Sequence, residues 1–345
     1  MTPLSTPVLV TGAAGFIGAA LVRKLLIKGE NVIGIDDLNS YYDPFLKKAR
    51  LNQIEVTRKL SDAQWTFYKI GLEDRTAMSE IFRVHSPSVV VNLAAQAGVR
   101  YSIDNPMSYV QSNLIGFFNI LELCRHEGVA NLIYASSSSV YGGNRNLPFT
   151  ESQQVNHPVS FYAATKKSNE LMAHTYSHLY KIPATGLRFF TVYGPWGRPD
   201  MAPMIFAKSI LANKPISIYN NGDMQRDFTY IDDIAESILR CCYKPATSND
   251  SFDPLNPDPS TSSAPHRIFN IGNSSPVELL TFIELLENSL GVKAIRELRP
   301  MQPGDVVATA ADTKRLEDWV GFRPKTSIED GISLFTRWYK DFYKV

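Results

Sequence analysis

The chain has 345 residues, of which 44% are hydrophobic and 20% are charged, and its formal net charge at pH 7 is +1. A chain of this length can form one large domain or two modest ones with an ample core. The nearly neutral charge argues against nucleic acid or an anionic membrane as a partner, because either would require a basic patch. We therefore expect neither of these partners.

The cysteines and the first residues both favour a cytoplasmic protein. The three cysteines show no metal-ligand spacing and cannot all pair, so reduced thiols and the absence of a metal site are expected. Residues 1–7 carry no basic residue, and Gly12 interrupts the apolar run that begins at Val8. This pattern is typical of neither a signal peptide nor a membrane span.

The beginning of the chain predicts a strand, a glycine-rich turn, a helix and a second strand. Gly12, Gly15 and Gly18 lie in the turn, and the second strand ends at Asp36. Glycines let the backbone approach a pyrophosphate at the helix N-terminus, where free N–H groups and the helix dipole favour anions. A carboxylate at the end of the second strand can accept hydrogen bonds from both hydroxyls of a ribose. Because Asp36 would repel a 2′-phosphate and no Arg or Lys adjoins it, the pattern predicts NAD rather than NADP.

Strands and helices alternate as far as residue 189. Such alternation predicts a right-handed, parallel, doubly wound α/β sheet, whose ligands bind outside the carboxyl ends of the strands. Small or polar residues fall at these ends, namely Gly12, Asp36, Ala94, Ser137 and Thr191. Their convergence predicts the position of the site.

Three regions depart from this alternation. Residues 38–51 predict a loop and a short basic helix, which we interpret as a solvated helix face. Residues 216–218 predict the beginning of a hairpin region that continues through 225–233. Residues 245–266 contain five prolines and almost no apolar side chains, which indicates a mobile surface excursion.

Tyr162 and Lys166 are four residues apart in a segment with helical signals, so their side chains share one helix face. Ser137, at the end of the preceding strand, can converge with them on one substrate hydroxyl. A free tyrosine has a pKa near ~10, so its use as a base near neutral pH requires a decrease of roughly 3 pH units, about 4 kcal/mol. We expect the Lys166 ammonium and a positively charged nicotinamide ring to lower the pKa of Tyr162.

With these motifs the chain resembles the extended short-chain dehydrogenase/reductases, specifically the NAD-dependent nucleotide-sugar epimerases, over essentially its whole length. Thr11-Gly12-x-x-Gly15-x-x-Gly18 matches the cofactor turn of this family, and Tyr162-x-x-x-Lys166 matches its catalytic pair.

The resemblance implies three sets of site residues. The catalytic residues are Ser137, Tyr162 and Lys166. The residues that contact NAD are Gly12, Gly15, Phe16, Ile17, Gly18, Asp36, Asn39, Leu72, Leu93, Ala94, Ala95, Tyr162 and Lys166. The residues that contact a UDP-sugar are Arg100, Ser102, Ser137, Ser139, Tyr162, Thr191, Arg198, Arg226 and Asp305.

Three stretches, at residues 38–44, 94–102 and 188–202, are similar to the UDP-glucuronate 4-epimerases. This similarity implies that Arg198 lies near the carboxylate of the uronate. The chain departs from the family at Gly71, where relatives carry an Asp that holds the adenine amine, and there Leu72 and the backbone could serve instead. Asn92 also replaces a more usual His in relatives.

The resemblance implies epimerisation at C4 of a UDP-sugar through a transient 4-keto sugar, most specifically between UDP-glucuronate and UDP-galacturonate. UDP-glucose and N-acetylated UDP-sugars remain open as substrates. UDP-glucuronate decarboxylases and 4,6-dehydratases carry a carboxylate near the strand serine, whereas Ser138 and Ser139 stand there in this chain. An NAD-sensing binding protein without enzymatic activity is disfavoured, because the catalytic serine, tyrosine and lysine are all kept.

The resemblance also implies the domain organisation. We expect a NAD-binding Rossmann domain at residues 1–188, to which residues 227–243 and 267–273 return, and a smaller substrate-binding α/β domain at 189–345. A homodimer is expected from the resemblance, and it fits the broad apolar stripe of the helix predicted at 105–127.

Overall fold

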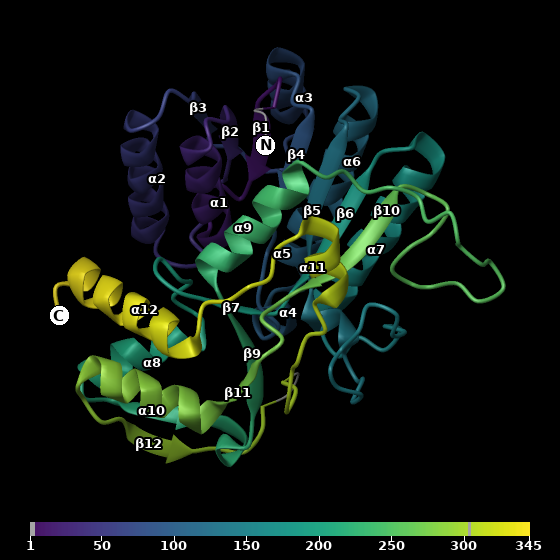
Figure 1. The fold of residues 1–345 in the computed structure, drawn as a ribbon. Coiled ribbons are helices and arrows are strands. Elements are labelled where there is room, and N and C mark those ends of the chain that lie inside the picture. The colour runs from purple at the N-terminus through teal and green to yellow at the C-terminus, as the bar shows by residue number, and fades with distance from the viewer. Residues whose placement is uncertain (1–3, 303–304) are drawn as a thin grey trace.

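The computed structural model describes residues 4–302 and 305–345. A seven-stranded sheet lies at its centre, in the order β10-β6-β5-β4-β1-β2-β3 (Figure 1). Its strands are β1 (Val8–Thr11), β2 (Val32–Ile35), β3 (Trp65–Tyr68), β4 (Val89–Asn92), β5 (Asn131–Ser137), β6 (Ala184–Phe189) and β10 (His266–Ile271). All neighbouring pairs are parallel, which confirms the predicted doubly wound α/β fold.

Helices cover both faces of this sheet. They are α1 (Phe16–Ile27), α2 (Pro44–Lys59), α3 (Arg75–His85), α6 (Gly116–His126), α7 (Phe161–Tyr180) and α9 (Ile231–Cys242). Val8 and Val10 pack in one core cluster with α1 and α9, whereas Leu9 points to the other face and packs with α3, α6 and α7. Since all three side chains are completely buried, β1 has the continuous apolar character of a strand covered on both sides.

The helix predicted at 105–127 is a longer and interrupted helical segment. It consists of α4 (Tyr101–Asp104), α5 (Pro106–Tyr109), a π-helical turn at Val110–Ile115, and α6. Pro106 begins a new helix because it has no N–H to donate. The π-helical turn is important for the site described below.

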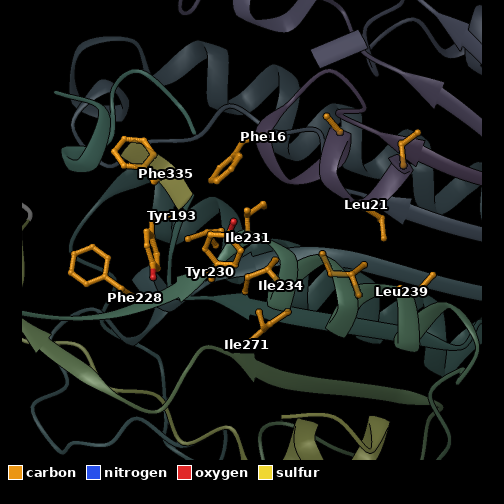
Figure 2. Close-up of a cluster of buried hydrophobic side chains, with 14 of the residues drawn as sticks. Phe16, Leu21, Tyr193, Phe228, Tyr230, Ile231, Ile234, Leu239, Ile271 and Phe335 are labelled. Carbon is orange, nitrogen blue, oxygen red and sulfur yellow. The ribbon is translucent and has the colours of Figure 1, made fainter. Parts of the chain in front are cut away.

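The remainder of the chain forms a smaller group of elements, seen at the lower left of Figure 1. Its strands and helices are β7 (Thr191–Tyr193), α8 (Ala202–Leu211), β8 (Pro215–Ile218), β9 (Gln225–Tyr230), β11 (Pro276–Glu278), α10 (Leu279–Leu290), β12 (Ile295–Leu298) and α12 (Ile328–Tyr343). The remaining helix, α11 (Lys314–Val320), packs instead beside β10 and α9 of the larger group. β9 pairs in parallel with β7 and antiparallel with β11. Figure 2 shows that aromatic side chains of β7, β9 and α12 pack beside Phe16 of α1, so one core is continuous between both groups.

The predicted hairpin region that begins at 216–218 is wrong. β8 pairs in parallel with the distant β12 and not with β9. Asn220 and Asn221, which follow β8, both have positive φ, at 49° and 53°. Two left-handed residues in succession would suit a hairpin turn, but here the Asn221 N–H donates to the Arg299 carbonyl at 3.1 Å, which ties this turn to the segment after β12 and not to β9.

Residues 245–265, all of which the structure describes, form no helix and no strand beyond one isolated bridge at Thr261. Their second half is held against the sheet edge, since the Ile268 N–H donates to the Ser260 carbonyl at 2.9 Å and Arg315 pairs with Asp258 at 2.8 Å. The mobility of this segment and the domain boundaries stay predictions. Within 4–302 and 305–345, no helix combines the length and the apolar character needed to cross a bilayer.

Candidate active site

A cavity of about 1010 Å³ lies at the carboxyl edge of the parallel sheet. The segments that follow β1 to β5 form one side of it, and β7, α8 and β9 contribute to the other. The predicted site residues that line it are Gly12, Gly15, Phe16, Ile17, Gly18, Asp36, Asn39, Leu72, Leu93, Ala94, Ala95, Arg100, Ser137, Ser139, Tyr162, Lys166, Thr191, Arg198, Arg226 and Asp305. Their individual roles stay predictions.

Ser102 is the predicted site residue that the structure does not bring to the cavity wall. Its side chain is buried, and its hydroxyl donates to the Val99 carbonyl at 2.6 Å. The hydroxyl therefore satisfies a backbone group beside the short helix α4, which leaves it turned away from the cavity.

The glycine-rich turn between β1 and α1 leaves no room for side chains. Gly12 has a φ of +69°, and a Cβ there would lie 2.8 Å from the Ala94 nitrogen. A Cβ at Gly18 would lie 2.0 Å from the Gly12 oxygen. The first turn of α1 carries no acidic residue and no side-chain cap. The turn thus fits the pyrophosphate of a dinucleotide, which binds to free N–H groups at such a helix N-terminus.

Asp36, at the end of β2, lies beside this turn. Its carboxylate accepts hydrogen bonds from the backbone N–H groups of Ala14, at 3.1 Å, and Leu38, at 2.9 Å. Contrary to the sequence-based expectation, a lysine does adjoin it: the Lys47 nitrogen lies 3.8 Å from the Asp36 carboxylate and donates to Asn39 at 3.0 Å. Burial raises the pKa of Asp36, and the Lys47 charge opposes this increase.

The interpretation of the basic helix as a solvated face is wrong for two of its residues, Lys47 and Arg50, because both are buried on α2. Lys47, Arg50 and Ile54 are spaced by three and four residues, so they share one helix face, and Ile54 is completely buried. This spacing was the signal in the sequence that could have revealed them.

Arg50 connects two parts of the cavity wall. Its guanidinium donates to the Ala14 carbonyl of the glycine-rich turn at 3.1 Å and to the Tyr42 hydroxyl at 2.6 Å. It also donates to the carbonyls of Trp196, at 2.7 Å, and Gly197, at 3.2 Å, in the loop that follows β7. A single buried cation therefore holds this loop against the turn.

Tyr162 and Lys166, the predicted catalytic pair, lie in the first two turns of α7. The Ser160 hydroxyl caps this helix by accepting from the Ala163 N–H at 3.1 Å. Lys166 donates to the Ala135 carbonyl of β5 at 3.0 Å, and burial lowers the pKa of Lys166 to about 8. The Ser137 hydroxyl, at the end of the same strand, donates to Ser139 at 3.1 Å.

The expectation that Lys166 lowers the pKa of Tyr162 is not met by the chain itself. Burial raises the pKa of Tyr162, while hydrogen bonding with Ser137 and the charge of Arg198 oppose this increase. Desolvation is the largest effect on this phenol, whose ring centroid lies 6.0 Å from that of Tyr109 in the cavity wall. The chain alone therefore favours the neutral phenol.

Asn113, in the π-helical turn, fixes the loop after β4 against α7. Its amide donates to the Gln96 carbonyl and to the Thr165 hydroxyl, both at 3.0 Å, and it accepts from the Gln96 N–H at 2.8 Å. Thr165 in turn donates to the Tyr162 carbonyl at 2.8 Å. Sequence reasoning missed this residue, because a π-helical turn leaves no recognisable periodicity.

Two arginine–aspartate pairs also line the cavity. Arg198 donates to Asp200 at 3.1 Å, and Asp200 also accepts from the Tyr41 hydroxyl at 3.1 Å. Burial would raise the pKa of Asp200, but the Arg198 hydrogen bond and charge lower it. Arg100 pairs with Asp305 at 3.0 Å. The sequence predicted the two arginines but not Asp200 or Tyr41.

Arg226, on β9, is a further arginine of the cavity wall. Its guanidinium donates to the carbonyls of Gln225, at 2.8 Å, and Val307, at 3.0 Å. Burial lowers the pKa of Arg226, and Asp305 opposes this decrease. Arg100, Arg198 and Arg226 thus bring positive charge to the cavity wall, as an anionic ligand would require.

Residues 8–272 match the model of the NAD dependent epimerase/dehydratase family. The protein CapI of Staphylococcus aureus is 53% identical over 337 residues, which cover 98% of this chain and 99% of CapI. A "Probable UDP-glucuronate 4-epimerase" of Rhizobium meliloti is 45% identical over 337 residues, or 97% of each chain. The UDP-glucuronic acid 4-epimerase of Bacillus cereus, solved with UDP-glucuronic acid and NAD, superposes with a TM-score of 0.86 at 31% identity, over 98% of this chain and 100% of that one.

Proposed function

The chain belongs to the NAD dependent epimerase/dehydratase family, and on this premise we propose that it interconverts UDP-glucuronate and UDP-galacturonate. The family match and the similar proteins confirm the resemblance to the NAD-dependent nucleotide-sugar epimerases that the motifs predicted. The chain is a UDP-sugar 4-epimerase that works with NAD. The choice of the uronate as the sugar is our proposal.

The position of Arg198 carries this choice. The C6 carboxylate of a uronate is attached to C5, next to the reacting C4, so a cation that recognises it must lie close to the group that acts on C4. Arg198 meets this condition, because it lines the same cavity as Tyr162, and a Cβ on Gly98 would lie 3.9 Å from its Nη2 atom and 3.7 Å from the hydroxyl of Tyr109, whose ring centroid is 6.0 Å from that of Tyr162. Asp200 accepts from the Nε and Nη2 atoms of Arg198, which leaves the Nη1 donors for a second carboxylate.

In the proposed reaction, Tyr162 takes the proton of the C4 hydroxyl and later returns it to the C4 oxygen. Ser137 holds this oxygen by a hydrogen bond. NAD supplies the hydride acceptor, and in its reduced form the donor, for C4. Asp36 and Lys166, which both line the cavity, would hold the two riboses of NAD.

The ionisation of Tyr162 requires help from nearby positive charge, because burial raises its pKa. Arg198 provides one such charge. Lys166, whose pKa is about 8, remains largely protonated near neutral pH and provides another in the same wall. Water exclusion from this wall strengthens both effects.

The decisive experiment is to incubate the purified protein with UDP-glucuronate and follow the products by NMR. We expect UDP-galacturonate to accumulate. UDP-xylose as the main product would instead establish decarboxylation, for which Ser138 and Ser139 offer no carboxylate. Parallel reactions with UDP-glucose and UDP-N-acetylglucosamine test the alternative epimerase substrates, and faster turnover of either would overturn the choice of the uronate. A protein that binds NAD but converts none of these sugars would support the NAD-sensing alternative.

We also propose a homodimer formed through α6 and α7. Phe118 of α6, together with Leu171 and Leu179 of α7, exposes between 40% and 59% of its surface. Light scattering coupled to gel filtration should give twice the mass of one chain. Replacement of Leu171 and Leu179 by Glu should give the mass of a single chain. A cytoplasmic location stays a prediction.

A further inference from the structure

Glu73 is a cavity residue that has no role in the site described so far. It lies in the loop between β3 and α3 and lines the cavity with Ile70 and Leu72. The next acidic residue, Asp74, already has a structural role, because its side chain caps α3 by accepting from the Ala77 N–H at 3.0 Å. In the described part of the chain, no hydrogen bond or ion pair occupies the Glu73 carboxylate.

The Glu73 carboxylate fills the space that a side chain at Gly71 would need. A Cβ on Gly71 would lie 2.1 Å from one carboxylate oxygen of Glu73 and 2.5 Å from the other. The side chain therefore folds back over the end of β3, where Gly71 also lines the cavity, while the residue as a whole remains exposed. Residue 71 must be glycine for Glu73 to take this position.

The backbone beneath this carboxylate is held on both sides. The Asp74 N–H donates to the Gly71 carbonyl at 3.2 Å, and the Asn119 amide donates to the Leu72 carbonyl at 2.9 Å. Leu72 itself is buried. The backbone that carries Glu73 is consequently fixed before a ligand binds, which limits the conformational entropy that the loop would lose on binding.

The strand order identifies the part of NAD that faces Glu73. The pyrophosphate site follows β1, and the Asp36 carboxylate for a ribose follows β2. Ser137 of the reacting centre follows β5, on the other side of β1. The adenine ring therefore lies on the β3 side, beyond Asp36, where Ile35, Ile70 and Leu72 provide an apolar wall.

We propose that Glu73 recognises the adenine ring of NAD by accepting a hydrogen bond from its exocyclic amine. An ionised carboxylate has only acceptors, so it matches an amine and opposes an oxygen at the same position of the purine. Glu73 thus serves both for affinity and for discrimination between a 6-amino and a 6-oxo purine. This inference uses NAD as the cofactor and does not depend on which sugar is converted.

The test is isothermal titration of two dinucleotides into protein freed of bound nucleotide. The dinucleotides are NAD and nicotinamide hypoxanthine dinucleotide, which carries an oxygen in place of the amine. We expect the wild-type protein to bind NAD about tenfold more tightly than its hypoxanthine analogue. Glu73→Ala should bind NAD about tenfold more weakly and lose the preference.

Two further variants separate recognition from a general effect. Glu73→Gln keeps a carbonyl oxygen for the amine and adds an NH2 group for the 6-oxo position. It should therefore bind NAD more tightly than Glu73→Ala while showing little preference between the dinucleotides. Glu80→Ala removes an exposed carboxylate of α3 that pairs with Arg83 outside the cavity, and it should bind as the wild-type protein does.

The preference between the dinucleotides decides the outcome. If Glu73→Ala binds NAD as tightly as the wild-type protein, or binds both dinucleotides more weakly with an unchanged preference, the proposal is overturned. Because binding is measured without turnover, failure of the sugar assignment would leave this result unaffected.

Discussion

Replacement of Arg50 by Met tests whether one buried cation holds the cofactor turn and the loop after β7 together. Methionine has nearly the length of arginine and can fill the same space, but it donates no hydrogen bond. The variant therefore removes the donors to Ala14, Tyr42, Trp196 and Gly197 while leaving little empty volume.

The expected loss of stability follows from these contacts. The guanidinium makes five hydrogen bonds, and at about 1 kcal/mol each their loss costs about 5 kcal/mol. Removal of a buried charge offsets part of this cost, because burial of an ion carries a desolvation penalty. A net loss of about 2–4 kcal/mol in the free energy of unfolding corresponds to a decrease of about 3–6 °C in Tm for a chain of this size.

Calorimetry and ligand binding measure two consequences of this change. Arg50→Met should lower Tm, weaken NAD binding through the Ala14 turn, and raise KM for the UDP-sugar through the loop that carries Arg198. Arg58→Met, on the exposed side of the same helix, is the matched control and should change none of these. An unchanged Tm and unchanged KM in Arg50→Met would refute the reasoning that this guanidinium connects the two segments.

Three further predictions concern Tyr162, Lys166 and Arg198 of the proposed site. Tyr162→Phe should reduce kcat by at least about 10³-fold while the Kd for NAD stays within about twofold, and an active variant would remove Tyr162 from the mechanism. Burial lowers the pKa of Lys166 from 10.5 to about 8 in the folded chain. Between these two pH values the unfolded chain therefore binds more protons than the folded chain, so the free energy of unfolding rises with pH. Lys166→Met should accordingly be more stable than the wild-type protein at pH 7, by up to about 3 kcal/mol in urea unfolding, and should lose this advantage by pH 10; an advantage independent of pH would contradict the assigned pKa. Arg198→Lys keeps the positive charge but loses the planar guanidinium that can bind a carboxylate through two hydrogen bonds. KM should therefore rise about tenfold for UDP-glucuronate and little for UDP-glucose. Equal increases for both sugars would exclude carboxylate recognition by Arg198.

The sequence by itself determined the features that depend on neighbouring residues. The glycine-rich turn, the carboxylate that ends β2, and the spacing of Tyr162 and Lys166 follow from local turn chemistry and helix periodicity. Parallel strands place their carboxyl ends at one edge, so the alternation of strands and helices was sufficient to bring these groups into one cavity.

Only the tertiary structure decided the contacts between residues that are distant along the chain. The pairing of β8 with β12 was decided in this way, and so was the approach of Lys47 to Asp36. The pKa of Tyr162 also depends on the packing around it, because burial outweighs the nearby charges. The physical reason is the same in each case: periodicity shows which face of an element is buried, but it does not show which distant groups share the space behind that face.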